Sequence, residues 1–492
     1  MAAEAAPAPP AVATGRAIAP GARTRLLLEG AIVPTLLRLA PANVAINVLS
    51  IAVNTSVDAY FVGRLEPSAL GGLALAFPLV MLMQQMANAG MGGAVASAVA
   101  RALGAGRAHD ANALAIHALG VAAAMATLFT VGFHLAGPAI YEAMGGTGVS
   151  VQAALAYSEV VFSGAAAYWV LSTLTSIVRG TGRLGFLAFV FVGAEALHVA
   201  LAPALIAGWG WLPRLGVAGA AAATVISFSV ASAVLVAYLR SRGSLVRLSP
   251  TGVRPRRALL TAILAVGGPA SVNVVLNNLA LLLLTGFVAR FGAPALAGYG
   301  LAVRLEYVQI PLVFGLGAGV LTMVGTNVGA QQTRRAERIA WTAAGLTAAI
   351  TGGLGLLAAV FPVLWMGVFT RDAAIGAAGA SYLRIVGPVH ALLGFGLGLQ
   401  WAALGAGRPL WPFLAGVSRF VCATGGSWIA LRWIDGDAAW VFAASATALV
   451  LFGAINVYGT LKTFAVGAEP RRRPAQSSAS SRRCMVSSSR PK

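Results

Sequence analysis

The stretch APANVAINVLSIAVNTSVDAYFV, residues 40–62, has the length and composition of a helix that crosses a lipid bilayer. Its one charged residue is Asp58. Because an α-helix rises about 1.5 Å per residue, about 20 apolar residues cross a hydrocarbon core of about 30 Å. Strands of a membrane barrel would instead alternate apolar and polar residues over segments of about 10 residues. This stretch therefore predicts a membrane-spanning helix.

The rest of the chain repeats this pattern. Its 492 residues are 58% hydrophobic and 10% charged, whereas about 25% of the residues of a soluble domain are charged. Apolar runs of helix length occur at about residues 31–62, 68–99, 112–138, 152–178, 185–208, 215–239, 258–289, 294–328, 337–366, 376–403, 409–431 and 437–462. Candidate kinks are Pro34, Pro41, Pro78, Pro203, Pro269 and Pro311. We expect an all-α integral membrane protein with twelve transmembrane helices.

The formal net charge of +20 comes mainly from arginines in loops and in a Ser/Arg/Pro-rich C-terminal tail. This distribution favours contact with the lipid bilayer surface over nucleic-acid binding. With twelve spans both termini lie on one side, and the loops predicted there hold fourteen arginines against five in the opposite loops. The positive-inside rule then predicts cytoplasmic termini. The excess of Arg, Ala and Gly is typical of a GC-rich bacterial genome, which would place the protein in the inner membrane.

The two halves of the chain resemble each other. RALGAGRAHDA at 101–111 matches TNVGAQQTRRA at 326–336, and VRGTGRLGF at 178–186 matches ALGAGRPLW at 403–411, both at a separation of 225 residues. Six spans lie between matching loops, so the halves are expected to be parallel repeats around a central cavity. The predicted parts are a disordered tail (1–28), a six-helix bundle (29–240), a basic linker (241–257), a second six-helix bundle (258–464) and a disordered basic tail (465–492).

Four motifs follow one another along the chain. They are VDAYFVGRLEPSALGGLALAFPL from residue 57, GMGGAVASAVARALGAGR from 90, RGTGR from 179 and GYGLAVRLEYVQIPLVFGLGAGVLTMVGTNVGA from 298. Together they resemble the multidrug and toxic compound extrusion (MATE) family over about residues 25–465. The resemblance implies export of small amphipathic organic cations in exchange for protons or sodium. We expect a monomer that is not an enzyme and whose two halves rock to give alternating access. The resemblance implies no ATP or other cofactor, and no GxxxxGK[ST] nucleotide-binding pattern occurs.

Three acidic residues lie within predicted spans: Asp58, Glu195 and Glu306. A charged side chain near the centre of a bilayer costs a few kcal/mol, so these acids are candidates for functional sites. The remaining acids lie in tails, in loops or at span ends.

Asp58 is the strongest candidate for cation coupling. At 100° per residue, one helix face carries a row of polar side chains: Asn43, Asn47, Asn54 and Asp58. Burial disfavours the ionised carboxyl group, so Asp58 can carry a proton at neutral pH. Sodium is the alternative ion, with oxygen ligands from Asn54 and Asn47. The resemblance implies the coupling role, whereas the competing hypothesis is a helix-end residue that pairs with Arg64.

Glu195 and His198 lie one turn apart in the fifth span. Histidine changes charge near neutral pH, so the two side chains predict a proton relay or, alternatively, a structural pair between helices. Some members of the family carry an Asn here and, four residues later, an Asp before a proline. This chain has His198 and Ala202 at those positions, so Glu195 is the candidate replacement for the missing acid.

Candidates in the second half are Glu306 and Asn277. Glu306 is expected to line a cavity or, equally, to neutralise an arginine within the spans: Arg304, Arg384 or Arg419. Asn277 stands where the resemblance implies the glutamate of a sodium site, so a sodium site of that kind is not expected.

The residues predicted to line the substrate cavity are Asn43, Met81, Gln84, Asn88 and Gln309. Methionine is deformable and suits a pocket that accepts many compounds, although such residues also fit ordinary core or lipid-facing positions.

Two other functions were weighed. A flippase for lipid-linked precursors would show a strongly basic central cavity, whereas few arginines lie within these spans. A membrane-embedded lipid or isoprenoid transferase needs acids clustered around a metal, or a nucleophile with its base. The acids here lie in separate helices, and two cysteines far apart predict no metal site.

Overall fold

The computed structural model describes residues 22–64, 67–210, 212–248, 256–433 and 437–465; within these, the side chains of residues 22–23, 50–56 and 67–69 are not described. Every regular element in the described part is helical. The first bundle comprises α2 (Ile32–Gly63), α3 (Pro67–Gln85), α4 (Gly93–Gly104), α5 (Ala108–Ala143), α6 (Gly148–Ser163), α7 (Ala165–Gly180), α8 (Leu184–Ala207) and α9 (Val217–Arg240). The second comprises α10 (Arg257–Ala289), α11 (Ala293–Gly329), α12 (Thr333–Val360), α13 (Pro362–Met366), α14 (Ala373–Val386), α15 (His390–Gly405), α16 (Leu410–Trp433) and α17 (Ala438–Ala465).

The twelve predicted spans are confirmed. In the described residues, eleven helices or joined helices are long and apolar enough to cross a membrane, and α6 with α7, bent by 50°, makes the twelfth. The protein is therefore an all-α membrane protein with two six-helix bundles, as the sequence predicts.

The helices are interrupted at places other than the predicted prolines. Pro41, Pro78, Pro203, Pro269 and Pro311 all lie inside continuous helices. The described interruptions within predicted spans are Gly164 between α6 and α7, a π-helical segment Met86–Gly92 between α3 and α4, Phe361 between α12 and α13, and a short 3-10 turn Gly387–Val389 between α14 and α15. Helices in a membrane tolerate proline because neighbouring helices satisfy the freed backbone groups.

The predicted disordered N-terminal tail contains a helix. Residues Ala22–Glu29 form α1, which packs against α11. Leu27 is 5% exposed, and its carbonyl oxygen accepts a hydrogen bond from Nδ2 of Asn327 at 3.0 Å. The prediction failed here because a short amphipathic segment gains its stability from the bundle that it contacts. The remainder of both predicted tails lies outside the described residues.

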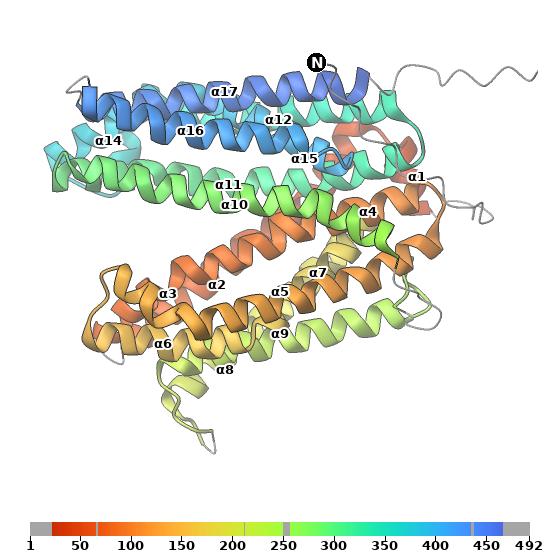
Figure 1. Ribbon diagram of the computed structural model, residues 1–492, viewed down its shortest axis with the longest axis horizontal. Helices are drawn as coiled ribbons and strands as arrows, with labels where there is room; N and C mark the ends of the chain where they lie inside the picture. The colour runs from red at the N-terminus through yellow and green to blue at the C-terminus, as the bar shows by residue number, and fades with distance from the viewer. Residues whose placement is uncertain (1–21, 65–66, 211, 249–255, 434–436, 466–492) are drawn as a thin grey trace, which may run out of the picture.

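The two bundles meet at one end of the molecule and diverge towards the other (Figure 1). We call the end where α4 ends and α10 begins the linker end. One hydrophobic core at the linker end is built from both bundles, including Val99 of α4, Val320 of α11 and Leu399 of α15. Two further cores belong to single bundles, one around Trp169 and the other around Phe442. The bundles thus share an apolar core only at the linker end.

The repeated glycine motifs form a close crossing of α4 and α11 at the linker end, which we call the seal. Gly104 of α4 lies against Thr326 of α11, and Gly329 of α11 lies against Arg101 of α4. A side chain at either glycine would collide with the carbonyl oxygen of the residue it faces. Each contact is the other one moved by the 225-residue repeat, so glycine is required twice for one symmetric helix crossing.

Candidate functional site

The buried acid Asp58 contacts a histidine from a helix distant in the sequence. Nε2 of His198 in α8 lies 3.0 Å from Oδ1 of Asp58 in α2. Asp58 is 3% exposed and His198 is 2% exposed. Helices α2 and α8 pack against each other, which brings these two predicted site residues together. A buried carboxyl group paired with an imidazole is an arrangement that can hold a proton.

The second nitrogen of His198 faces a hydroxyl group. Oγ1 of Thr224 in α9 lies 3.4 Å from Nδ1 of His198 and also donates to the carbonyl oxygen of Ala220 at 3.2 Å. A hydroxyl group can accept or donate a hydrogen bond, so Nδ1 can exist with or without its hydrogen. The neutral imidazole and the charged imidazolium are therefore both compatible with this site.

Thr224 and Tyr157 lie near the pair. Tyr157 in α6 is buried and interacts electrostatically with Asp58. Neither residue is among those predicted from the sequence. A signal for Thr224 was present, because its hydroxyl follows the apolar run AGAAAA in a predicted span.

Glu195 is buried on the helix that carries His198. It is 2% exposed and interacts electrostatically with Tyr168. The contacts described for His198 run to Asp58 and Thr224, so the predicted relay from Glu195 to His198 stays a prediction.

The predicted asparagine row extends along α2 away from Asp58. Asn43 is buried, and its carbonyl oxygen accepts a hydrogen bond from Nδ2 of Asn47 at 2.8 Å. Eleven residues separate Asn47 from Asp58, which is about 16 Å along a helix. One ion therefore cannot touch both side chains, contrary to the expected sodium ligand set. Asn54 lies one turn before Asp58, but its side chain is outside the described residues.

The predicted substrate-cavity residues of α3 and the π-helical segment have different surroundings. Asn88 donates from Nδ2 to the hydroxyl of Tyr168 at 2.6 Å and accepts from Oγ of Ser172 at 2.9 Å. Met81 and Gln84 are half-buried. Asn88 thus forms a polar cluster with two residues of α7. It belongs to a π-helical segment, a feature frequent at functional sites.

The second bundle contains another acid and histidine, Glu306 in α11 and His390 in α15. Nε2 of His390 lies 3.9 Å from Oε1 of Glu306, which accepts a hydrogen bond from the hydroxyl of Tyr382 at 2.9 Å. Nε2 of Gln309 lies 3.2 Å from Nδ1 of His390 and donates to the carbonyl oxygen of Thr351 at 3.3 Å. His390 is completely buried and was not among the predicted residues.

The arginines proposed as partners of Glu306 have other neighbours. Arg304 lies over the ring of Phe369 at 5.5 Å, and Arg419 lies over the ring of Phe452 at 5.8 Å. In the described part of the chain, no ion pair joins Glu306 to an arginine. Asn277 is exposed on α10.

The family model MatE matches the chain twice, over residues 44–204 and 269–429. Both boundaries of the second match follow those of the first by 225 residues, which is the separation of the repeated motifs. The chain belongs to the MATE family. Members of this family are membrane transporters, so the protein is a multi-pass transporter and not an enzyme.

Relatives of this MATE protein include three bacterial transporters. The chain is 30% identical over 220 residues to the probable multidrug resistance protein YoeA of Bacillus subtilis, a match that covers 44% of the chain and 47% of YoeA. It is 25% identical to the FAD transporter of Shewanella oneidensis, over 63% of the chain and 69% of the relative. It is 24% identical to the probable multidrug resistance protein NorM of Thermotoga maritima, over 77% of the chain and 81% of the relative. The chain thus spans about half the length of YoeA and more of the others.

The fold of this MATE protein matches solved structures. A structure described as the outward-facing conformation of a multidrug resistance MATE family transporter superimposes with a TM-score of 0.81 at 23% identity, over 91% of this chain and 99% of that one. A transporter from Pyrococcus furiosus, described as having a binding pocket of reverse polarity, gives a TM-score of 0.82 over the same shares. At this identity the likeness concerns the fold alone.

Proposed function

We propose that this protein exports amphipathic organic cations in exchange for protons, and that the Asp58–His198 pair is the coupling site. The observation that carries the proposal is the 3.0 Å contact between a buried carboxyl group and a buried imidazole. Both residues are costly to bury when charged.

The chemistry of the pair supplies the exchange. With Asp58 ionised and His198 neutral, the pair has a net charge of −1 and attracts an organic cation. When one proton enters, it resides on His198 or on Asp58 and the net charge becomes zero. The hydrogen bond between the two side chains persists in both cases, because either partner can be the donor. Cation and proton therefore compete for the pair, which is the condition for obligatory exchange.

Sodium fits this arrangement less well than a proton. A hard cation takes oxygen ligands, whereas Oδ1 of Asp58 is within hydrogen-bond distance of an imidazole nitrogen. A sodium ion at Asp58 would have to share the carboxylate with the imidazole of His198.

Helix α2 is suited to transmit the charge change to the second bundle. Its C-terminal part carries Asp58 beside α8, and its N-terminal part packs against α11. There Gly315 and Gly319 of α11 lie against Val44 and Leu39 of α2. A helix that contacts both bundles can couple protonation to their rocking during alternating access.

The linker end is proposed to face the cytoplasm. The excess of arginines in the loops at that end supports this orientation. The divergent end in Figure 1 would then face outwards, and protons entering from outside would reach Asp58 and release the substrate on that side.

The test is export of a fluorescent organic cation from proteoliposomes under a proton gradient, under a sodium gradient and without either. Wild type should export under the proton gradient, and Asp58→Asn should lose this export at equal protein amounts. Glu159→Gln, which changes an exposed acid of α6, is the matched control. Proton-driven export by Asp58→Asn at the wild-type rate would refute the coupling site. Transport of FAD instead of the cation would refute the substrate class.

A further inference from the structure

The segment between the bundles is fastened to α5 at two points. The backbone N–H of Arg247 donates to Oδ1 of Asn112 at 2.8 Å, and the backbone N–H of Arg256 donates to Nε2 of His117 at 2.9 Å. Val246, beside the first point, is completely buried in the core. At these two described points, Arg247 and Arg256, the chain is held by the first bundle, and α10 of the second bundle begins at the residue after Arg256.

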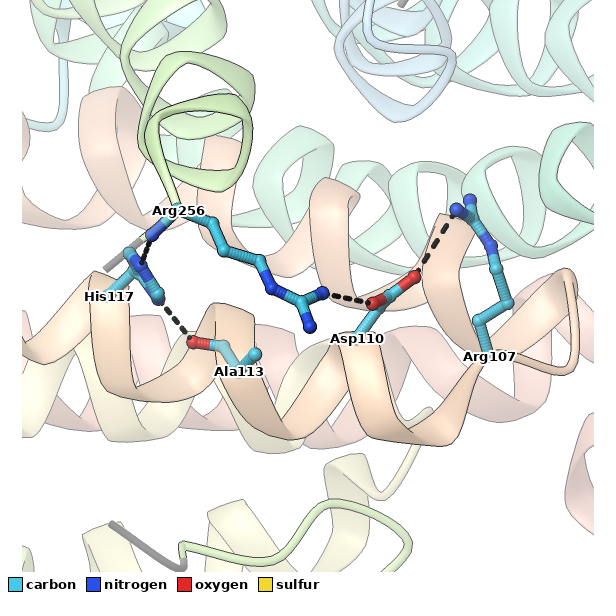
Figure 2. Close-up of polar contacts among 5 residues, drawn as sticks. All are labelled: Arg107, Asp110, Ala113, His117 and Arg256. Atoms are coloured by element: carbon cyan, nitrogen blue, oxygen red, sulfur yellow. Dashed lines mark hydrogen bonds and ion pairs between the residues drawn. The ribbon is translucent and has the colours of Figure 1, made fainter. Parts of the chain in front are cut away.

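Figure 2 shows the second point, which we call the linker clip: His117 and Asp110 of α5 with Arg256. Nη1 of Arg256 lies 3.3 Å from Oδ1 of Asp110, whose other oxygen lies 3.3 Å from Nη1 of Arg107. Backbone and side chain of Arg256 are therefore both held by α5.

The hydrogen bonds of His117 allow only one protonation state. Its Nδ1 lies 2.8 Å from the carbonyl oxygen of Ala113, which only accepts, so Nδ1 carries the hydrogen. Its Nε2 faces the N–H of Arg256, which only donates, so Nε2 must be unprotonated. An imidazolium would place two N–H groups against each other and lose this bond.

The charged groups nearest to His117 belong to the linker clip itself. One carboxylate, Asp110, lies between the guanidinium groups of Arg107 and Arg256, and Arg257 follows directly. The charged groups on the other elements packed against α5 point elsewhere. They are Arg101 of α4, which donates to Ser97 and Gly405; Arg179 of α7, which interacts with Tyr168; and Glu159 of α6, which is exposed.

We propose that His117 is a pH-sensitive fastener of the pivot between the two bundles. Neutral His117 holds the first turn of α10 on α5 and keeps the seal at the linker end closed. Protonation of His117 releases Arg256, frees the start of α10 and lets the seal open. Histidine is the side chain that changes charge between about pH 5 and 8. The fastener would respond to cytoplasmic pH, a detail that rests on the orientation proposed above; the coupling role of Asp58 is not required.

Amide hydrogen exchange of the purified full chain in lipid nanodiscs tests this inference. The peptide with Arg256 and the start of α10 should exchange about fivefold faster at pH 5.5 than at pH 7.5, after correction for intrinsic rates, because one hydrogen bond is lost. The peptide with Gly104 at the seal should also exchange faster at pH 5.5 than at pH 7.5.

Three variants separate protonation from other effects of pH. His117→Gln keeps an acceptor for Arg256 but cannot be protonated, so protection should persist at both pH values. His117→Ala removes the acceptor, so the peptide with Arg256 should exchange rapidly at both pH values. His109→Gln, at an exposed histidine of the same helix, should behave as wild type.

Three outcomes would overturn the inference: wild-type exchange at Arg256 that does not change with pH, a wild-type response in His117→Gln, or release of Arg256 with no change at the seal. In the Asp58→Asn variant, exchange of the peptide with Arg256 should keep its wild-type dependence on pH, so failure of the coupling site and failure of the fastener are distinguishable.

Discussion

Each bundle places an acid beside a buried histidine, but the two pairs differ in the partner of the second imidazole nitrogen. In the first bundle Nδ1 of His198 faces the hydroxyl of Thr224. In the second, Nδ1 of His390 faces the amide nitrogen of Gln309. The orientation of that amide is set by the carbonyl oxygen of Thr351, because only an N–H group can bond to it.

This difference decides which histidine can be protonated. A hydroxyl group can adapt to a charged or a neutral imidazole, whereas the amide N–H donates only, so Nδ1 of His390 must be unprotonated. His390 also lies farther from its acid, at 3.9 Å against 3.0 Å. The pair in the first bundle is suited to exchange protons, and the pair in the second is suited to hold one state.

The pairs are not copies made by the internal duplication. At the 225-residue offset of the two matched segments, the counterpart of His198 is Ala423 and the counterpart of Glu306 is Met81. The duplication thus produced two similar bundles, and each acquired its acid–histidine pair on different helices.

The largest effect should separate the two acids. We expect Asp58→Asn to lower proton-driven export about tenfold or more, which lies within the usual range of coupling between two ligands. Glu306→Gln should stay within about twofold, because glutamine still accepts the hydrogen bond from Tyr382. Initial rates in proteoliposomes with equal protein amounts measure both, and equal losses would contradict the distinction between the pairs.

Replacing the histidines should have the next largest effect. His198→Gln preserves a hydrogen bond to Asp58 but cannot take up a proton, so export should fall about fivefold and lose most of its dependence on pH. His390→Gln should keep the wild-type pH profile. Rates measured across about pH 5.5 to 8.5 test this pair of variants; a flattened profile in His390→Gln would assign proton exchange to the second bundle as well.

Removing the hydroxyl beside His198 should have a smaller effect. In Thr224→Val the imidazolium loses the acceptor for its Nδ1–H, so a lower pH is needed to protonate the pair. The midpoint of the export profile should move down by about 0.5 pH unit, as expected for one hydrogen bond. Thr224→Ser restores the hydroxyl and should restore the midpoint; an unshifted profile in Thr224→Val would show that Thr224 only packs.

The smallest effect on export is expected for Gln309→Leu. This change removes the donor to His390 and Thr351, so it should lower the midpoint temperature of unfolding by a few degrees while export stays near wild type. Gln85→Leu, at an exposed position at the end of α3, is the control. Thermal unfolding in detergent and transport rates are measured on the same preparations, and a loss of export without a loss of stability would give Gln309 a transport role.

Sequence alone was sufficient for the twelve spans, the duplication and the family. Apolar runs of helix length have few alternatives in a membrane, because each backbone polar group must be satisfied within its own segment. The acids within the spans, including Asp58, are also apparent from the sequence, since a charge there is costly.

The partners of those acids depended on the packing of distant helices. Asp58 and His198 are 140 residues apart, and the sequence does not indicate which faces of α2 and α8 contact each other. The sequence predicts Glu306 either at a cavity or beside an arginine, and it lies beside His390 and Tyr382. The break at Gly164 had no local signal as strong as the prolines, which the surrounding helices accommodate. Hydropathy is a property of one segment, whereas a buried polar contact and a bend arise from several segments packed together.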